Sequence, residues 1–250
     1  MRYRLVVQYE GTAYAGWQVQ PRARTVQGEF ERALATLTGQ AVRVLAAGRT
    51  DAGVHAAGQV ISFALDRAWE PGVLVRALNA LTPEDISVLA ADVVPEDFHP
   101  RRWAISRLYT YRIWNHRVLS PFWRRYAWHV VPALDVEAMQ AAAAKVCGEH
   151  DFSAFRAAGC EARHPVRCVL RSSLLREGEI LVYSIEANGF LRHMVRNLVG
   201  TLVEVGLGKR APEEVDELLA ARKRTLAGPT APAHGLCLSA VRYPDPLAKP

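Results

Sequence analysis

One short stretch, from Gly48 to Gly58, brings together residue types that can do chemistry. It reads GRTDAGVHAAG and contains one carboxylate, Asp51, with Arg49 two residues before it and His55 four residues after it. A carboxylate held in an enclosed site can act as a nucleophile or as a base. An Asp-x-Gly sequence by itself is typical of a turn in which the aspartate caps its own backbone. The added arginine, threonine, histidine and glycines favour a functional loop.

The segments on either side predict how this loop is held. Residues 42–47 and 59–65 are apolar or alternating runs, which predict two β-strands joined by the stretch. Glycines at positions 48, 53 and 58 permit positive φ angles and the close approach of another backbone or of a ligand.

Length and composition describe a folded chain with an excess of arginine. The 250 residues suffice for one large domain or two small ones, and half of them are hydrophobic. The net charge is +6, the pI is about 9.3, and lysine occurs only at positions 145, 209, 223 and 249. Because arginine suits bidentate phosphate contacts, a polyanionic partner is predicted, although genome composition can produce the same bias.

The cysteines and the N-terminus predict neither a metal site nor a membrane segment. Cys160, His164 and Cys168 are evenly spaced, but no fourth ligand follows at a regular distance, so free thiols are expected. No signal-peptide pattern is present, and no apolar run approaches the roughly 20 residues of a spanning helix. We therefore expect a soluble, cytoplasmic protein.

The remaining patterns predict an α+β fold with a mixed, mainly antiparallel sheet, since short strands follow one another at hairpin-like spacing. The character of the chain changes near Trp103, which predicts an N-terminal half over 1–104 and a C-terminal half over 105–250. Further strands are expected at 5–9, 86–94, 105–114, 169–175, 180–187 and 236–241. Helices are expected from Thr25 to Gly39, from Pro71, from Asp135 to Gly148, over 190–203 and from Pro212.

Aromatic and basic residues gather in two places. In the loop 11–18, Tyr14 and Trp17 are interpreted either as a stacking surface for bases or as the edge of a core. Between Arg101 and Tyr126, seven arginines alternate with aromatic rings, a composition typical of nucleic-acid surfaces. The alternative is a two-sided strand with solvated arginines. The arginines assigned to phosphates here are Arg101, Arg102, Arg112, Arg124 and Arg125.

The helix predicted over 190–203 has two distinct faces. Leu191, Met194 and Leu198 belong to its apolar face, and His193, Arg196 and Gly200 to its polar face. A glycine on the polar face leaves room for another group to lie across the helix, which favours a functional face.

Several blocks of this sequence resemble the tRNA pseudouridine synthase A family. The stretch from Gly48 to His55 is similar to the family signature residue for residue. The other similar blocks follow in the same order and span almost the whole chain: 11–18, 97–99, 107–111, 193–197 and 231–236.

The resemblance implies an enzyme that isomerises uridine to pseudouridine in the anticodon stem-loop of tRNA, at positions 38, 39 and 40. It implies no cofactor and no metal, and a homodimer that holds tRNA in clefts shared by both subunits. It also implies one sheet running through two pseudo-symmetric halves, with the catalytic cleft between them.

The resemblance further implies a role for individual residues. Asp51 corresponds to the catalytic aspartate, Tyr109 to the tyrosine that stacks on the target base, and Arg196 to the arginine that pairs with the aspartate. Leu108 stands where some relatives have another arginine, so one contact is absent from the pattern. The further substrate-binding candidates are Arg49, His193, Arg24, Arg101 and Arg107.

These residue types suit the chemistry. The target base must leave its stem, the N1–C1′ bond must break, and C5 must then bond to C1′. Asp51 would attack C1′, attack ring C6 or remove a ribose proton, and the sequence leaves all three routes open. The Tyr109 hydroxyl is a candidate base for the C5 proton. Two rival interpretations are a non-catalytic RNA-binding protein and a nucleoside or glycoside hydrolase, although no second carboxylate accompanies Asp51.

Overall fold

The computed structural model describes residues 1–245 and 247, and their contacts divide the chain into two compact units. Unit 1 comprises residues 1–105 together with 237–250, and unit 2 comprises residues 106–236. Both units combine β-strands with helices, so the predicted α+β class is confirmed. The last strand belongs to unit 1, whereas the predicted C-terminal half extended over all of 105–250.

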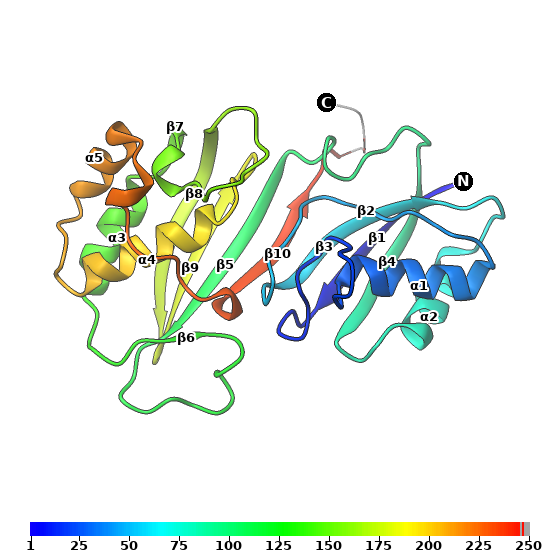
Figure 1. Ribbon diagram of the computed structural model, residues 1–250, viewed down its shortest axis with the longest axis horizontal. Helices are drawn as coiled ribbons and strands as arrows, with labels where there is room; N and C mark the ends of the chain where they lie inside the picture. The colour runs from blue at the N-terminus through cyan, green and yellow to red at the C-terminus, as the bar shows by residue number, and fades with distance from the viewer. Residues whose placement is uncertain (246, 248–250) are drawn as a thin grey trace. The chain divides into compact units, whose positions relative to one another are not determined.

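Unit 1 is built on a sheet with the strand order β4, β1, β3, β10 (Figure 1). Strand β1 runs antiparallel to both β3 and β4, and β10 runs parallel to β3. Helix α1 packs against α2, and α2 packs against β4. The elements are β1 (Arg2–Tyr9), α1 (Val26–Thr38), β2 (Leu45–Ala46), β3 (His55–Ala64), α2 (Pro71–Leu81), β4 (Ile86–Val94) and β10 (Leu236–Arg242).

The helix ends in unit 1 follow from local chemistry. The Thr25 side chain accepts a hydrogen bond from the Gly28 N–H, and α1 stops at Gly39, which has a φ of 73°. Pro71 occupies the first turn of α2, where its missing N–H costs nothing, and the Glu70 carboxylate caps the next two N–H groups. These predicted boundaries are confirmed.

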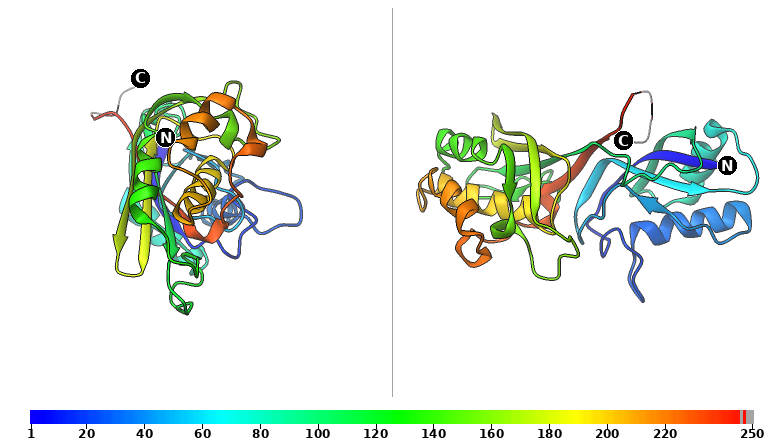
Figure 2. Two further views of the ribbon diagram at one scale, coloured as in Figure 1. Left: turned by 90° about the vertical axis from the view of Figure 1, so that its left-hand side faces the viewer. Right: turned by 90° about the horizontal axis from the view of Figure 1, so that it is seen from above.

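Unit 2 is built on antiparallel neighbours in the order β5, β9, β8, β7, with the short β6 parallel to β5. Helix α3 packs on β8 and on α4, and α4 and α5 lie on one side of the strands (Figure 2, left). The elements are β5 (Ser106–Trp114), β6 (Trp128–His129), α3 (Val136–Ala144), β7 (Gly148–Asp151), η1 (Ser153–Phe155), β8 (Val166–Glu177), β9 (Ile180–Ala187), α4 (Met194–Gly206), α5 (Glu214–Ala221), η2 (Arg224–Leu226) and η3 (Ala233–Gly235).

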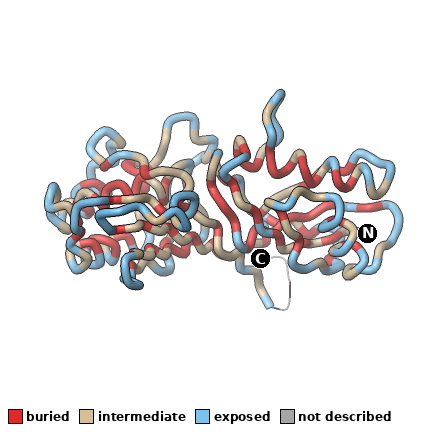
Figure 3. The backbone as a smooth tube through the Cα atoms, turned by 90° about the horizontal axis from the view of Figure 1, so that it is seen from below, coloured by how far each residue is buried: buried red, intermediate tan, exposed pale blue. Residues whose placement is uncertain are grey.

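Each unit has its own core, which Figure 3 shows as buried segments within the strands and helices and exposed segments at the loops. In β5 buried residues alternate with half-buried ones from Arg107 to Trp114. None of the helices among residues 1–245 and 247 combines the length and apolarity required to cross a bilayer.

Several predicted boundaries are wrong. Helix α3 ends at Ala144 rather than at Gly148, because Gly148 has a φ of 100° and already begins β7. His55 to Gly58 belong to β3 and not to the preceding loop, since they continue its ladder. Within the predicted strand 42–47, only Leu45 and Ala46 form a strand, β2, and the Ala47 N–H after it still donates to the Val60 carbonyl oxygen of β3 at 2.8 Å.

The helix predicted from 190 begins at Met194, because His193 lies before it with a φ of 60°. Gly200 is buried rather than part of an open polar face. A Cβ added at Gly200 would lie 1.7 Å from the Pro229 carbonyl oxygen, so the chain's own loop crosses the helix there. The room that the glycine provides is therefore already occupied.

We expect Gly200→Ala to destabilise the protein by at least about 2 kcal/mol, because the new methyl group overlaps a backbone carbonyl that cannot move alone. Chemical denaturation measures the loss. Gly72→Ala in α2 is the matched control, since the nearest atoms there belong to the end of the Glu70 side chain. It should stay within about 0.5 kcal/mol of wild type, because alanine also favours the helix. Equal losses in the two variants would contradict this account of Gly200.

Candidate active-site residues in the two units

In unit 1, Asp51 begins a tight turn between β2 and β3. The Val54 N–H donates to the Asp51 carbonyl oxygen at 3.1 Å, which closes a four-residue turn. Gly53, the third residue, has a φ of 78°, a conformation that a glycine adopts without strain. The Asp51 side chain is half-buried and Arg49 is exposed. The turn thus presents one carboxylate from a short, defined backbone.

The loop from Gly11 to Trp17 packs directly against this turn. The Trp17 N–H donates to the Thr50 carbonyl oxygen at 3.0 Å, and the Gly53 N–H donates to the Tyr14 carbonyl oxygen at 3.3 Å. A Cβ at Gly11 would lie 2.0 Å from the Val54 carbonyl oxygen, so only glycine allows this approach. Two loops that are distant in sequence therefore form one backbone assembly around Asp51.

The aromatic residues of this loop are part of the core of unit 1. Tyr14 is 3% exposed and Trp17 is 2% exposed, and the Trp17 ring lies between Tyr9 and Phe30. Of the two interpretations of these rings, the core interpretation is confirmed. Their function here is to support the loop.

Arg24 is held by carboxylates within unit 1. Its guanidinium forms two hydrogen bonds with Asp85, at 2.9 and 3.1 Å, and one with Glu29 at 3.2 Å. It also lies 4.4 Å from the centre of the Tyr14 ring, whose hydroxyl donates to Asp85. Burial and the contact with Asp85 raise the pKa of Tyr14, so the hydroxyl remains a donor. Arg24 is thus engaged beside the Asp51 loop, and its predicted contact with RNA stays a prediction.

His55 is buried at the first position of β3. Its Nδ1 accepts a hydrogen bond from the Gly11 N–H at 3.0 Å, so that nitrogen carries no proton. The Glu10 carboxylate lies 3.6 Å from the same atom. His55 therefore links the Asp51 stretch to the start of the loop 11–17.

In unit 2, Tyr109 lies on β5 with only 9% of its surface exposed. Its ring meets the half-buried Phe190 edge to face, with the centroids 5.0 Å apart. The sequence patterns do not single out Phe190, because they place it at the start of the helix predicted over 190–203. Arg107, two residues before Tyr109, is 8% exposed and donates to the Asn188 carbonyl oxygen at 3.0 Å. Its guanidinium thus bonds to the backbone within the unit.

The start of α4 and the loop 229–235 hold Arg196. Its Nε donates to the Ala231 carbonyl oxygen at 2.7 Å, and the Ala231 N–H donates to the Arg196 carbonyl oxygen at 3.1 Å. The Tyr111 hydroxyl donates to the Pro232 carbonyl oxygen at 2.8 Å, which fixes the same loop. Burial raises the pKa of Tyr111 and the nearby Arg196 charge opposes this rise. The guanidinium therefore has a defined position in unit 2.

The remaining predicted residues are more open to solvent. His193 is half-buried at the N-terminus of α4, where its carbonyl oxygen accepts from the Asn197 N–H at 2.9 Å. Arg101 is exposed in unit 1. Together, unit 1 contains Asp51, Arg49, Arg24 and Arg101, and unit 2 contains Tyr109, Arg196, His193 and Arg107.

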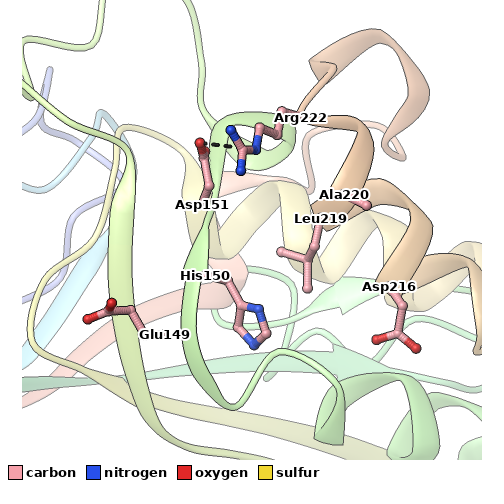
Figure 4. Close-up of a pocket in the computed structure, with 7 residues that line it drawn as sticks. All are labelled: Glu149, His150, Asp151, Asp216, Leu219, Ala220 and Arg222. Atoms are coloured by element: carbon pink, nitrogen blue, oxygen red, sulfur yellow. Dashed lines mark ion pairs between the residues drawn. The ribbon is translucent and has the colours of Figure 1, made fainter.

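A hollow of about 400 Å³ lies elsewhere, between β7 and α5 of unit 2 (Figure 4). Three of its charged residues form ion pairs: Asp151 with Arg222 at 3.3 Å, and Asp216 with Lys145 at 2.6 Å. None of the predicted site residues lines it. We therefore do not assign the chemistry to this hollow.

Comparison with known proteins decides the family. The family model described as tRNA pseudouridine synthase matches residues 5–101 and 142–244. The chain belongs to the tRNA pseudouridine synthase family. The matched segments include Asp51 and Arg196, whereas Tyr109 lies between them.

Full-length relatives support the same family. A protein of Myxococcus xanthus called tRNA pseudouridine synthase A is 50% identical over 246 residues, which cover 98% of this chain and 92% of the relative. A protein of the same name from Moorella thermoacetica is 50% identical over 242 residues, covering 96% and 98%. A chain in the crystal structure of a Cbf5–Nop10–Gar1 complex matches 80% of this chain and 54% of its own length. Its TM-score of 0.34 and identity of 12% are too low to support an argument.

Proposed function

We propose that this protein isomerises uridine to pseudouridine in the anticodon stem-loop of tRNA, at positions 38, 39 and 40, with Asp51 as the catalytic carboxylate. Membership of the tRNA pseudouridine synthase family supports the reaction and the substrate class. The proposal also includes a cytoplasmic homodimer, as the resemblance of the sequence implies.

The observation that carries the assignment of Asp51 is its backbone setting. Asp51 is the first residue of a turn. The residue before it, Thr50, and the third residue of the turn, Gly53, are both hydrogen-bonded to the loop 11–17. A catalytic group must keep its geometry while the substrate changes, and backbone bonds on both sides restrict its motion. An ordinary surface turn does not require a second loop that packs against it, with a glycine at the point of closest approach.

Tyr109 and Arg196 are proposed to act on the same uridine from unit 2. Extraction of the base from a stem costs a few kcal/mol, and stacking on an aromatic ring offsets about 1 to 3 kcal/mol of this cost. The Tyr109 ring is the proposed platform, and its orientation is supported by Phe190. Arg196 is the proposed counter-charge for the Asp51 carboxylate, since a guanidinium stabilises an ionised acid.

The reaction leaves the atomic composition of the nucleotide unchanged. The N1–C1′ bond breaks, the uracil turns while bound, C5 bonds to C1′, and the C5 proton leaves as N1 gains one. Asp51 serves by attack on C1′, by attack on C6, or by removal of a ribose proton, and each route requires the ionised carboxylate. The Tyr109 hydroxyl is the proposed acceptor of the C5 proton.

Tritium release from tRNA that carries 5-tritiated uridine tests the proposed function directly, because only loss of the C5 hydrogen frees the label. Mapping pseudouridine in tRNA from cells without this protein tests the positions, and loss at 38, 39 and 40 is the expected result. Stoichiometric tRNA binding without product would instead support a non-catalytic RNA-binding protein. Free uracil as the product would support a hydrolase.

The phosphate contacts are proposed to come from the basic segment that follows Phe98. Residues 98–134 contain seven arginines and no aspartate or glutamate, so the segment by itself carries a net positive charge. Arg117, Arg124 and Arg125 are exposed in the loop after β5. This charge distribution favours a polyanionic partner over an acidic or neutral one.

We expect Arg124→Gln to weaken tRNA binding and to reduce the slope of log affinity against log salt by about one, because one phosphate contact releases about one counterion. Binding titrations at several salt concentrations measure the slope. Arg67→Gln is the matched control, because Arg67 is also exposed but lies in the connection after β3. Its slope should equal that of wild type. Identical slopes for wild type and Arg124→Gln would remove Arg124 from the interface.

A further inference from the structure

A fully buried polar network lies directly beside the Asp51 turn in unit 1. Its members are Tyr9, Thr50 and Gln59, whose exposed fractions are 4%, 6% and 0%. Burial of polar groups costs free energy unless each group finds a hydrogen-bond partner. Apolar side chains at these three positions would avoid this cost, so the polar residues there need a functional or structural explanation.

The network holds the chain at two points just before Asp51. The Tyr9 hydroxyl and the Thr50 Oγ1 are 2.8 Å apart and share a hydrogen bond. The Gln59 Nε2 donates to the Gly48 carbonyl oxygen at 2.8 Å and also contacts the Tyr9 hydroxyl at 3.5 Å. Strands β1 and β3 are neighbours in the sheet (Figure 1). The side chains of Tyr9 and Gln59 thus hold Thr50 and Gly48, which lie on either side of Arg49.

Thr50 is fixed from a second direction as well. Its carbonyl oxygen, which belongs to the peptide bond to Asp51, accepts from the Trp17 N–H at 3.0 Å. The side chain of Thr50 is therefore held from β1 and its carbonyl from the loop 11–17. Because one rigid peptide bond joins Thr50 to Asp51, a small displacement of Thr50 would also displace Asp51.

We propose that Tyr9 and Gln59 are positioning residues, which act through Thr50 and Gly48 to hold the Asp51 carboxylate in its productive place. This inference rests on the proposed function, because it takes Asp51 as the catalytic residue. Displacement of a catalytic group by a fraction of an ångström lowers the rate without changing how the substrate binds. Loss of the network should therefore lower kcat and leave KM unchanged.

The chemistry of Tyr9 sets a second expectation. Burial raises the pKa of Tyr9 to about 12, so the hydroxyl is neutral throughout the working range of pH. A neutral positioning group contributes equally at each pH. We therefore expect kcat of Tyr9→Phe to be lower than wild type by the same factor at every pH, so that the two pH profiles have the same shape.

The test compares two buried tyrosines of the same strand. Tyr3 is 0% exposed on β1, and its hydroxyl bonds to the Trp69 carbonyl oxygen at 2.9 Å and to the Trp69 N–H at 2.7 Å. Tyr9→Phe and Tyr3→Phe remove the same atom from the same core, but only Tyr9 bonds to the Asp51 stretch. Loss of stability should be at least as large in Tyr3→Phe, since its two hydrogen bonds are both 2.9 Å or shorter, whereas one of the two at Tyr9 is 3.5 Å long.

We expect Tyr9→Phe to lower kcat about tenfold with KM within about twofold of wild type, and Tyr3→Phe to retain wild-type kcat. Steady-state tritium release by the full chain measures both constants, at a temperature where thermal unfolding shows each variant to be folded. Thr50→Val should match Tyr9→Phe, whereas Thr50→Ser should restore kcat because it keeps the hydroxyl. The double variant Tyr9→Phe, Thr50→Val should be no slower than either single variant.

The outcomes separate this inference from the function on which it rests. If the wild type makes pseudouridine and Tyr9→Phe does so at the same kcat, the positioning role is overturned and the function stands. Equal loss of kcat in Tyr3→Phe also overturns it, because the effect would then be general. Failure of the wild type to make any pseudouridine overturns both.

Discussion

Asp51→Asn is expected to reduce pseudouridine formation by at least about 10⁴-fold, because the amide cannot replace a carboxylate that attacks or removes a proton. The turn should survive the change, since the hydrogen bond that closes it joins the backbone atoms of Asp51 and Val54. Affinity for tRNA should stay within about threefold of wild type. Single-turnover tritium release measures the chemistry, and a binding titration measures the affinity.

Asp66→Asn is the matched control for this change. Asp66 is also in unit 1, is exposed, and lies in the connection after β3, so its substitution alters the net charge by the same amount. It should leave the rate unchanged. Near-normal tritium release by Asp51→Asn would remove Asp51 from the mechanism.

Tyr109→Phe is expected to lower the rate of tritium release by about 10² to 10⁴-fold, the range typical of the loss of a general base. The ring is retained, and with it the edge-to-face contact with Phe190, so stacking on the base and tRNA affinity should persist. Tyr109→Leu removes the ring as well and should weaken tRNA binding in addition. Rapid-quench measurement of the single-turnover rate, together with binding titrations, separates the two effects.

Tyr183→Phe controls for the loss of a buried hydroxyl in the same unit. Tyr183 is fully buried on β9, next to β5, and its hydroxyl shares a hydrogen bond of 3.0 Å with Ser172 Oγ. The variant should lose some stability and no activity. A wild-type rate in Tyr109→Phe would restrict Tyr109 to the role of a platform.

Local rules were reliable where a structure depends on neighbours in sequence. Thr25 and Gly39 predicted both ends of α1, because a side-chain cap and a left-handed residue act within one helical turn. Pro71 likewise predicted the start of α2, because a proline in the first turn of a helix loses no backbone hydrogen bond. Predictions of this kind need no knowledge of the tertiary fold.

The errors arose where distant segments meet. The polar face predicted on α4 includes Gly200, which is covered by the Pro229 backbone from a later part of the chain. The sequence allows two interpretations of Tyr14 and Trp17, and only their burial in the folded chain decides between them. Gly148 looked like the end of a helix, yet pairing with Val169 makes it the start of a strand. A single sequence does not reveal which loop will supply such a partner.

The amino-acid sequence by itself determined the family of this protein, the α+β class and the candidate carboxylate, because the residue types and their spacing around Asp51 are local and specific. Only the tertiary structure decided what surrounds that carboxylate. The loop 11–17, Tyr9 and Gln59 reach it from other parts of the chain. Arg24 likewise faces Asp85, 61 residues away. The reason is that hydrogen bonds and close packing depend on distance in space, which the order of residues along the chain does not give.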